Sequence, residues 1–169
     1  MQHPLTVRPA TAHDVAELAT LLNTIIEIGG TTAFEQPLSD AEFGEAFLAG
    51  DGHICCFVAE AEDGSLAGFQ SLERHALLPN DWVNISTFAR VEPKVRGVGT
   101  ALFAATLEHA REAGVVAINA RIRADNTGGL AFYEKIGFST YDVDAGVPLS
   151  DGTPVDRISK KYDVAGSGH

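Results

Sequence analysis

The chain runs Val91-Glu92-Pro93-Lys94-Val95-Arg96-Gly97-Val98-Gly99-Thr100-Ala101-Leu102 from an expected strand, residues 82–91, into an expected helix, residues 99–113. Gly97 and Gly99 stand at the turn, where a missing Cβ permits unusual backbone angles and close approach by another group. The N–H groups of the helix's first turn have no partner within the helix and lie at the positive end of its dipole. The turn is therefore either an anion site suited to phosphate or a glycine-rich connection that binds nothing.

The spacing of the glycines separates the kinds of phosphate site. A Walker loop requires a lysine directly after its last glycine, and this turn has none. A dinucleotide-binding turn requires glycine or alanine at the position that Leu102 occupies, so that pattern fails as well. The pattern that the turn does fit is Arg96-x-x-Gly99-x-Ala101.

A second glycine-bearing segment follows one expected helix and one expected strand later. It reads Asn126-Thr127-Gly128-Gly129-Leu130-Ala131-Phe132-Tyr133-Glu134-Lys135-Ile136-Gly137-Phe138. Two glycines in the first turns of a helix each cost about 1 kcal/mol relative to alanine, so we interpret them as leaving room for close approach. Asn126, Gly129 and Tyr133 share one helix face, which would suit an extended thioester. The alternative for Tyr133 is a packing tyrosine with a satisfied hydroxyl.

These two segments together resemble the GNAT superfamily of acetyl-coenzyme A-dependent N-acetyltransferases, and the resemblance extends over residues 5–143. It implies that the pyrophosphate of coenzyme A is wrapped by the backbone N–H groups of Arg96, Gly97, Val98, Gly99, Thr100 and Ala101. It also implies that Val91 pairs with the pantetheine arm and that Asn126, Gly129 and Tyr133 contact the donor. Val7-Arg8-Pro9-Ala10-Thr11-x-x-Asp14 and Thr31-Thr32-Ala33-Phe34-Glu35 resemble, more weakly, the phosphinothricin acetyltransferase subgroup.

Hydrophobic periodicity and turn residues predict the order β-α-α-β-β-β-α-β-α-β-β. Hairpins come before two β-to-α units, which indicates an α+β fold with a mixed, mostly antiparallel sheet and helices on both faces. Capping boxes at Thr11/Asp14 and Ser39/Glu42 are expected to start the first two helices. A turn-rich loop is expected over residues 144–154.

Composition sets the broad class of protein. The chain has 169 residues and a net charge of −11, so we expect one globular domain over residues 1–164, a flexible tail over 165–169, and no nucleic-acid binding. No apolar run is long enough to span a membrane. Cys55 and Cys56 are adjacent in an expected strand, which favours buried reduced thiols and a cytoplasmic location. We expect no metal, because no suitable ligand spacing occurs among His3, His13, His53, His75 and His109.

The reaction implied by the resemblance is direct attack of an amine on the acetyl thioester. Tyr133 is the expected general acid, and a backbone N–H near Val91 is expected to stabilise the oxyanion. Glu35, in the loop that lines the acceptor site in this family, is the leading candidate for the base; the other candidates are Glu73, His75, Asp81 and Glu92. Arg121 and Arg123 could meet a substrate carboxylate or lie on a solvated face, and we favour the solvated face.

The expected acceptor is the primary amine of a small molecule, such as an amino acid or an analogue. One alternative is acetylation of a protein N-terminus or lysine, because an acidic surface attracts basic peptides. Another is a non-catalytic module that binds acyl-CoA on the same fold. The resemblance also makes a homodimer plausible.

Overall fold

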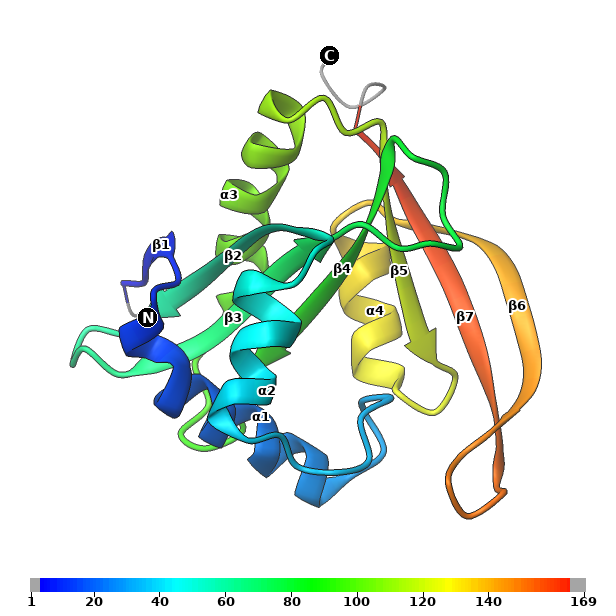
Figure 1. Cartoon of the computed structure of the whole chain (residues 1–169), viewed down its shortest axis with the longest axis horizontal. Coiled ribbons are helices and arrows are strands. Elements are labelled where there is room, and N and C mark those ends of the chain that lie inside the picture. Colours follow the sequence, from blue (N-terminus) through cyan, green and yellow to red (C-terminus); the bar gives the residue numbers. More distant parts are fainter. Residues whose placement is uncertain (1–3, 165–169) are drawn as a thin grey trace.

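A computed structural model describes residues 4–164 and contains, within that range, a seven-stranded sheet (Figure 1). The spatial order of the strands is β1-β2-β3-β4-β5-β7-β6, and every neighbouring pair is antiparallel except β4 and β5. The strands are β1 (Thr6–Pro9), β2 (His53–Glu60), β3 (Leu66–Glu73), β4 (Trp82–Ala89), β5 (Ala117–Arg123), β6 (Ser139–Pro148) and β7 (Pro154–Asp163). The predicted element order and α+β class are confirmed. The tail predicted for residues 165–169 lies outside the described residues.

Helices lie on both faces of the sheet, as the sequence predicts (Figure 1). They are the 3₁₀ turn η1 (Ala12–Asp14), α1 (Val15–Ile28), α2 (Asp40–Gly44), the π-helical turn η2 (Glu45–Ala49), α3 (Val98–Glu112) and α4 (Thr127–Lys135). Phe69 of β3 packs with α1, α2 and η2, while Leu72 of the same strand packs with α3 and α4. Because alternate residues of a strand point to opposite faces, these two side chains mark two separate cores.

The parallel pair at the centre of the sheet is short. Strands β4 and β5 pair only where Trp82–Asn84 lies beside Ala117–Asn119. Beyond that point the two strands part, and Figure 1 shows α4 behind the gap that they leave. The remaining half of β4 therefore has backbone groups on its β5 side that no strand pairs.

Strand β4 ends earlier than the sequence predicts. Its last residue is Ala89, and Arg90 then turns the chain by donating from its side chain to Pro93 O, Ser65 Oγ and Leu66 O. Val91 consequently lies in the loop and is 41% exposed, rather than on the strand as expected. Sequence periodicity could not show this, because the anchoring contacts come from the turn between β2 and β3.

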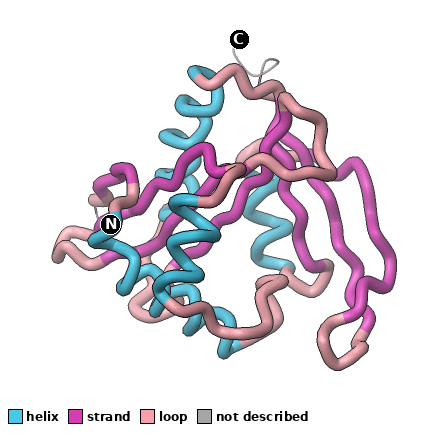
Figure 2. The backbone as a smooth tube through the Cα atoms, in the orientation of Figure 1, coloured by secondary structure: helices cyan, strands magenta, loops and turns pink. Residues whose placement is uncertain are grey.

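The loop expected over residues 144–154 is wrong for about half of its length, since only residues 149–153 lie outside the strands. Strand β6 continues to Pro148 and pairs with β7 in a long hairpin (Figure 2). An irregularity between Asp144 and Val147 accommodates Gly146, whose φ is +65° and whose N–H donates to Asp156. Glycine and aspartate in this segment are typical of turns, but here they form a bulge within a paired strand.

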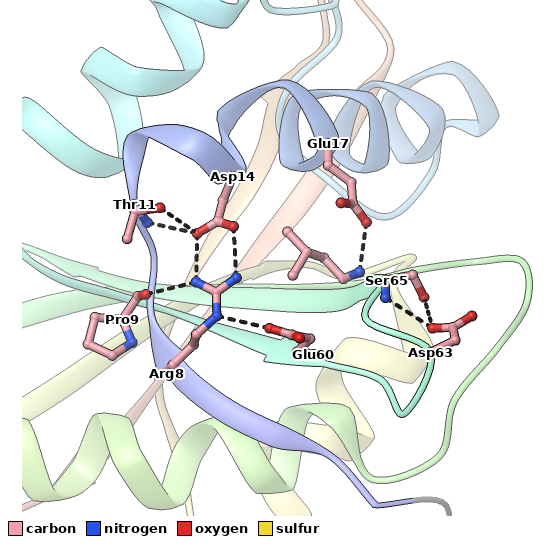
Figure 3. Close-up of polar contacts among 9 residues, drawn as sticks. Arg8, Pro9, Thr11, Asp14, Glu17, Glu60, Asp63 and Ser65 are labelled. Carbon is pink, nitrogen blue, oxygen red and sulfur yellow. Dashed lines mark hydrogen bonds and ion pairs between the residues drawn. The ribbon is translucent and has the colours of Figure 1, made fainter.

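A partly buried ion pair joins β1 to the start of the first helix (Figure 3). The Arg8 guanidinium donates to both oxygens of Asp14 at 2.8 and 2.9 Å and to Glu60 on β2 at 3.0 Å. Asp14 also accepts from the backbone of Thr11 at 2.8 Å, which confirms the first predicted capping box. The second, Ser39 with Glu42, is confirmed as well. Within the described chain, no helix has the length and apolar character needed to cross a bilayer.

Candidate active site

A cavity of about 310 Å³ opens where β4 and β5 part. Its walls come from the loop after α1, from β3, β4 and β5, from the start and middle of α4, and from β7. The polar residues of the lining include Thr32, Glu73, His75, Thr87, Arg121, Arg123, Asn126, Tyr133 and Arg157. At this volume the cavity lies at the small end of ligand-binding pockets, so it suits a small molecule or the tip of a larger one.

Tyr133 points from α4 into the sheet and is 7% exposed. Its hydroxyl lies 2.9 Å from Thr87 Oγ1, and Gln70 Nε2 donates to that same Thr87 oxygen at 2.9 Å. Burial raises the pKa of Tyr133 to about 12, although the Thr87 hydrogen bond opposes the rise. The phenol is therefore protonated throughout the physiological pH range. The sequence did not predict a role for Thr87, because nothing near a threonine in a strand indicates which distant side chain it will contact.

The start of α4 has a capping arrangement that explains one of its glycines. Asn126 Oδ1 accepts from Gly129 N at 2.9 Å, and Asn126 Nδ2 donates to Thr31 O at 3.0 Å. A Cβ at position 129 would lie 2.9 Å from Asn126 Cγ. Gly129 thus makes room for the capping side chain, whereas the sequence suggested room for a ligand. Asn126 joins α4 to the loop after α1.

The turn between β4 and α3 has the predicted geometry. Gly97 has a φ of +79°, which favours glycine, and the first hydrogen bond of the helix runs from Ala101 N to Gly97 O. The N–H groups of Val98, Gly99 and Thr100 precede that bond and remain available for an anion. A Cβ on Gly99 would lie 2.6 Å from Phe132 Cε1, so this glycine also lets α4 approach α3. The two motifs found in the sequence are therefore in contact.

Only two of the five candidates for the general base line the cavity. Glu73 and His75 line it, while Glu35 does not. The Glu35 carboxylate instead accepts from Ser150 N at 3.0 Å and from Ser150 Oγ at 2.7 Å, which ties the loop after α1 to the tip of the β6–β7 hairpin. Asp81 and Glu92 also lie outside the set of lining residues.

Three arginines line the cavity, although the chain as a whole is acidic. Arg121 is exposed and pairs with Asp144 at 3.0 Å. Arg123 is 9% exposed, donates to both oxygens of Asp125 at 2.9 and 2.7 Å, and donates to Thr32 O at 3.1 Å. The solvated face that we favoured is wrong for Arg123. Arg157, 7% exposed, was missed because only the β5–β7 register places it beside Arg123.

Two further expectations concern cysteines and metals. Cys55 and Cys56 are free and buried, and burial raises their pKa values to about 11 and about 12. Neither thiol is therefore an activated nucleophile. Within residues 4–164, no three His, Cys, Asp or Glu side chains are grouped so that they could hold a metal ion.

Comparison with known proteins identifies the family. The model of the acetyltransferase (GNAT) family matches residues 19–138, so the chain belongs to that family. The expectations of GNAT membership and of an acetyl-CoA-dependent N-acetyltransferase are thereby confirmed. The matched residues include strands β4 and β5, the glycine turn between β4 and α3, and α4.

Two of the similar proteins carry names from the phosphinothricin acetyltransferase subgroup. YwnH of Bacillus subtilis (strain 168), whose name assigns it provisionally to the phosphinothricin acetyltransferases, is 26% identical over 162 residues, 95% of each protein. A crystal structure with the same provisional assignment has a TM-score of 0.83 and 26% identity, over 95% of this chain and 99% of that one.

A third comparison concerns a structure with the donor bound. A phosphinothricin acetyltransferase from Sinorhizobium meliloti, solved in complex with acetyl-CoA, has a TM-score of 0.81 and 22% identity. The match spans 94% of this chain and 88% of that one. At this identity the likeness establishes the shared fold. The predicted resemblance to the phosphinothricin acetyltransferase subgroup is confirmed by the first two comparisons, each at 26% identity.

Proposed function

We propose that the protein transfers the acetyl group of acetyl-CoA to the primary amine of a small molecule, an amino acid or an analogue, by direct attack. The observation that carries this proposal is the cavity between β4 and β5, which brings a buried, protonated Tyr133 together with cationic side chains. Its volume of about 310 Å³ favours a small acceptor over a folded protein surface. The relatives named for phosphinothricin acetyltransferase support the same class of acceptor.

The donor would lie on the side of α3 and α4. Its pyrophosphate would be held by the backbone from Arg96 to Thr100, where the N–H groups of Val98, Gly99 and Thr100 are available. The Ala101 N–H, which was expected to join them, already donates to Gly97 O. When bound, acetyl-CoA supplies an activated thioester carbonyl. The contacts predicted for Val91, Asn126, Gly129 and Tyr133 remain proposals. A donor that contacts Asn126 and Gly129 would have to do so without breaking the hydrogen bond between them. A donor contact with Val91 would come from the loop after β4 and not from the strand.

The chain's own groups account for the polar steps. Tyr133 would give its proton to the leaving sulfur, and its high pKa keeps that proton in place until charge develops there. The unpaired half of β4, residues 85–89, offers backbone N–H groups toward the gap for the oxyanion. This position replaces the one expected near Val91, because β4 ends at Ala89.

The base is the least determined role. Glu35 remains a candidate, but its carboxylate is held by Ser150, whereas Glu73 and His75 line the cavity. Single variants Glu35→Gln, Glu73→Gln and His75→Gln, each measured as kcat/KM against pH, separate the three. The base is the residue whose replacement removes the acidic limb of the profile.

An acceptor panel tests the proposed function. We expect thiol release from acetyl-CoA with free amino acids or their analogues and not with lysine-bearing or N-terminal peptides. Turnover on peptides alone would favour the protein-acetylating alternative. Acetyl-CoA binding in calorimetry without turnover on any amine would favour the non-catalytic alternative. The homodimer and the cytoplasmic location stay predictions, and light scattering of the purified protein tests the first.

A further inference from the structure

Two arginines face each other across neighbouring strands in the wall of the cavity. Arg123 of β5 and Arg157 of β7 are direct partners in the antiparallel register. Both side chains are more than nine-tenths buried, and both line the cavity. Like charges placed directly opposite each other destabilise a sheet. The pair is therefore costly unless negative charge is supplied beside it.

Only one of the two arginines has an ion pair, because Asp144, which lies opposite Arg157 on β6, pairs with Arg121 instead. Arg123 has a bidentate ion pair with Asp125. Arg157 donates to the backbone oxygen of Val155 at 2.9 Å, and no described carboxylate forms an ion pair with it. The acidic groups that act on it electrostatically, Asp125 and Glu35, are hydrogen-bonded elsewhere, to Arg123 and to Ser150.

The electrostatics of Arg157 agree with its geometry. Burial, and then the charges of Arg123 and Arg121, lower the pKa of Arg157, while Asp125 and Glu35 act in the opposite direction. A buried guanidinium without an anion pays a desolvation cost that an ion pair would offset. The planar fork of arginine matches the two oxygens of a carboxylate better than any other side chain does.

We propose that Arg157, with Arg123 beside it, forms the subsite that binds the carboxylate of the acceptor, so that the acceptor is a free amino acid. The inference rests on the proposed function, because it names the second polar group of the same small-molecule amine. It separates a free amino acid from a peptide N-terminus, whose first residue carries an amide where the amino acid carries the carboxylate. It assigns specificity to a strand that the sequence motifs do not include.

The experiment compares amino acids with their own carboxamides, which keep the amine and side chain and lose only the negative charge. For the wild-type protein we expect kcat/KM for the acid to exceed that for the amide by roughly 30-fold or more. Arg157→Gln should bring that ratio close to one by lowering the value for the acid. Acetyl-CoA affinity, measured by calorimetry, should stay within about threefold of the wild type, since Arg157 lies on the acceptor side.

Two further variants test whether a changed ratio comes from the guanidinium of Arg157 or only from the loss of a positive charge on β7. Lys161→Gln removes the same charge from the same strand, outside the cavity lining, and should leave the ratio unchanged. Arg157→Lys keeps the charge without the fork and should lower the ratio partially; it replaces Arg157→Gln if the latter fails to fold, as judged by its melting curve. An unchanged ratio in the folded Arg157 variant, or a wild-type ratio near one, overturns the carboxylate subsite while leaving the acetyltransferase intact.

Failure of the proposed function is distinguishable from failure of the subsite. If no amine is acetylated, the proposed function falls, and the subsite is decided by titrating the amino acids directly into the wild type and into Arg157→Gln. Binding to the wild type that is lost in the variant supports the subsite. No binding to the wild type, or equal binding to both, overturns it.

Discussion

The hydroxyl oxygen of Tyr133 lies 2.9 Å from that of Thr87, although 46 residues separate them in the chain. Thr87 in turn accepts from Gln70, so a partly buried row of three polar side chains crosses from β3 through β4 to α4. This row fixes the position of the phenol in the wall of the cavity. The proposed general acid is therefore held by the sheet as well as by its own helix.

Tyr133→Phe should lower kcat by roughly 100-fold or more, because the leaving sulfur loses its proton donor. The affinity for acetyl-CoA should change little, since the ring and its packing remain. Tyr162→Phe is the matched control, because Tyr162 packs in the same core through its ring and should keep its activity. Wild-type turnover by the Tyr133→Phe variant would reduce Tyr133 to a packing residue.

Asn126 allows its two contacts to be separated. Asn126→Ala loses the cap on Gly129 and should lower the free energy of unfolding by about 1 kcal/mol. Asn126→Asp keeps an acceptor for the Gly129 N–H but loses the donor to Thr31 O. We expect the aspartate variant to keep most of the stability in urea unfolding and to show a raised KM for the acceptor. Equal losses of stability in both variants would contradict the cap.

Gly99 gives α4 room to pack on α3, and it also has a proposed role in donor binding; a double variant separates the two. Gly99→Ala should lower the melting temperature, because its Cβ would overlap the Phe132 ring, and should weaken acetyl-CoA binding. Adding Phe132→Leu should recover part of the melting temperature without restoring the affinity. Melting-temperature losses that simply add would show that residues 99 and 132 are uncoupled.

The Arg8–Asp14 pair gives the fold a pH dependence on the acidic side. The pKa of Asp14 is lowered from 3.8 to about 2, chiefly by its hydrogen bond to Arg8. A carboxyl with a lowered pKa stabilises the fold above its unfolded pKa and loses that effect as the pH falls through its folded pKa. We expect about 2 kcal/mol of the free energy of unfolding to be lost between roughly pH 4 and pH 2.

Urea unfolding of Asp14→Asn checks that expectation. The variant should be less stable than the wild type at neutral pH and should converge with it near pH 2. Glu112→Gln, a change at an exposed carboxylate, should follow the wild-type profile throughout. Parallel profiles for Asp14→Asn and the wild type would show that Asp14 does not titrate with folding.

The sequence predicted the order of the elements and the class of the fold because periodicity and turn residues are local signals. It also located the glycine turn and Tyr133, since both stand in motifs of fixed spacing. It placed the end of β4 too late and replaced half of β6 with a loop. In both places the outcome depends on contacts with distant segments, through Arg90 in one and the pairing with β7 in the other.

The sequence singled out more residues for the proposed donor side of the candidate site than for the proposed acceptor side. The proposed donor side lies in two contiguous motifs, whereas the proposed acceptor side is assembled from residues that only the sheet brings together. Arg157 shows this most clearly, because nothing near it in the chain hints at Arg123. Gly129 shows the converse. The sequence indicated that this position requires glycine, and in the structure the missing Cβ makes room for the capping side chain of Asn126.

The parting of β4 from β5 has a consequence for the order of events in the proposed reaction. Donor and acceptor would reach one point from opposite faces of the same sheet, so neither needs to leave before the other enters. No side chain has to carry the acetyl group between them. The rate law should therefore be sequential, with initial-velocity lines that intersect, and desulfo-coenzyme A should compete with acetyl-CoA while leaving the acceptor's own entrance open.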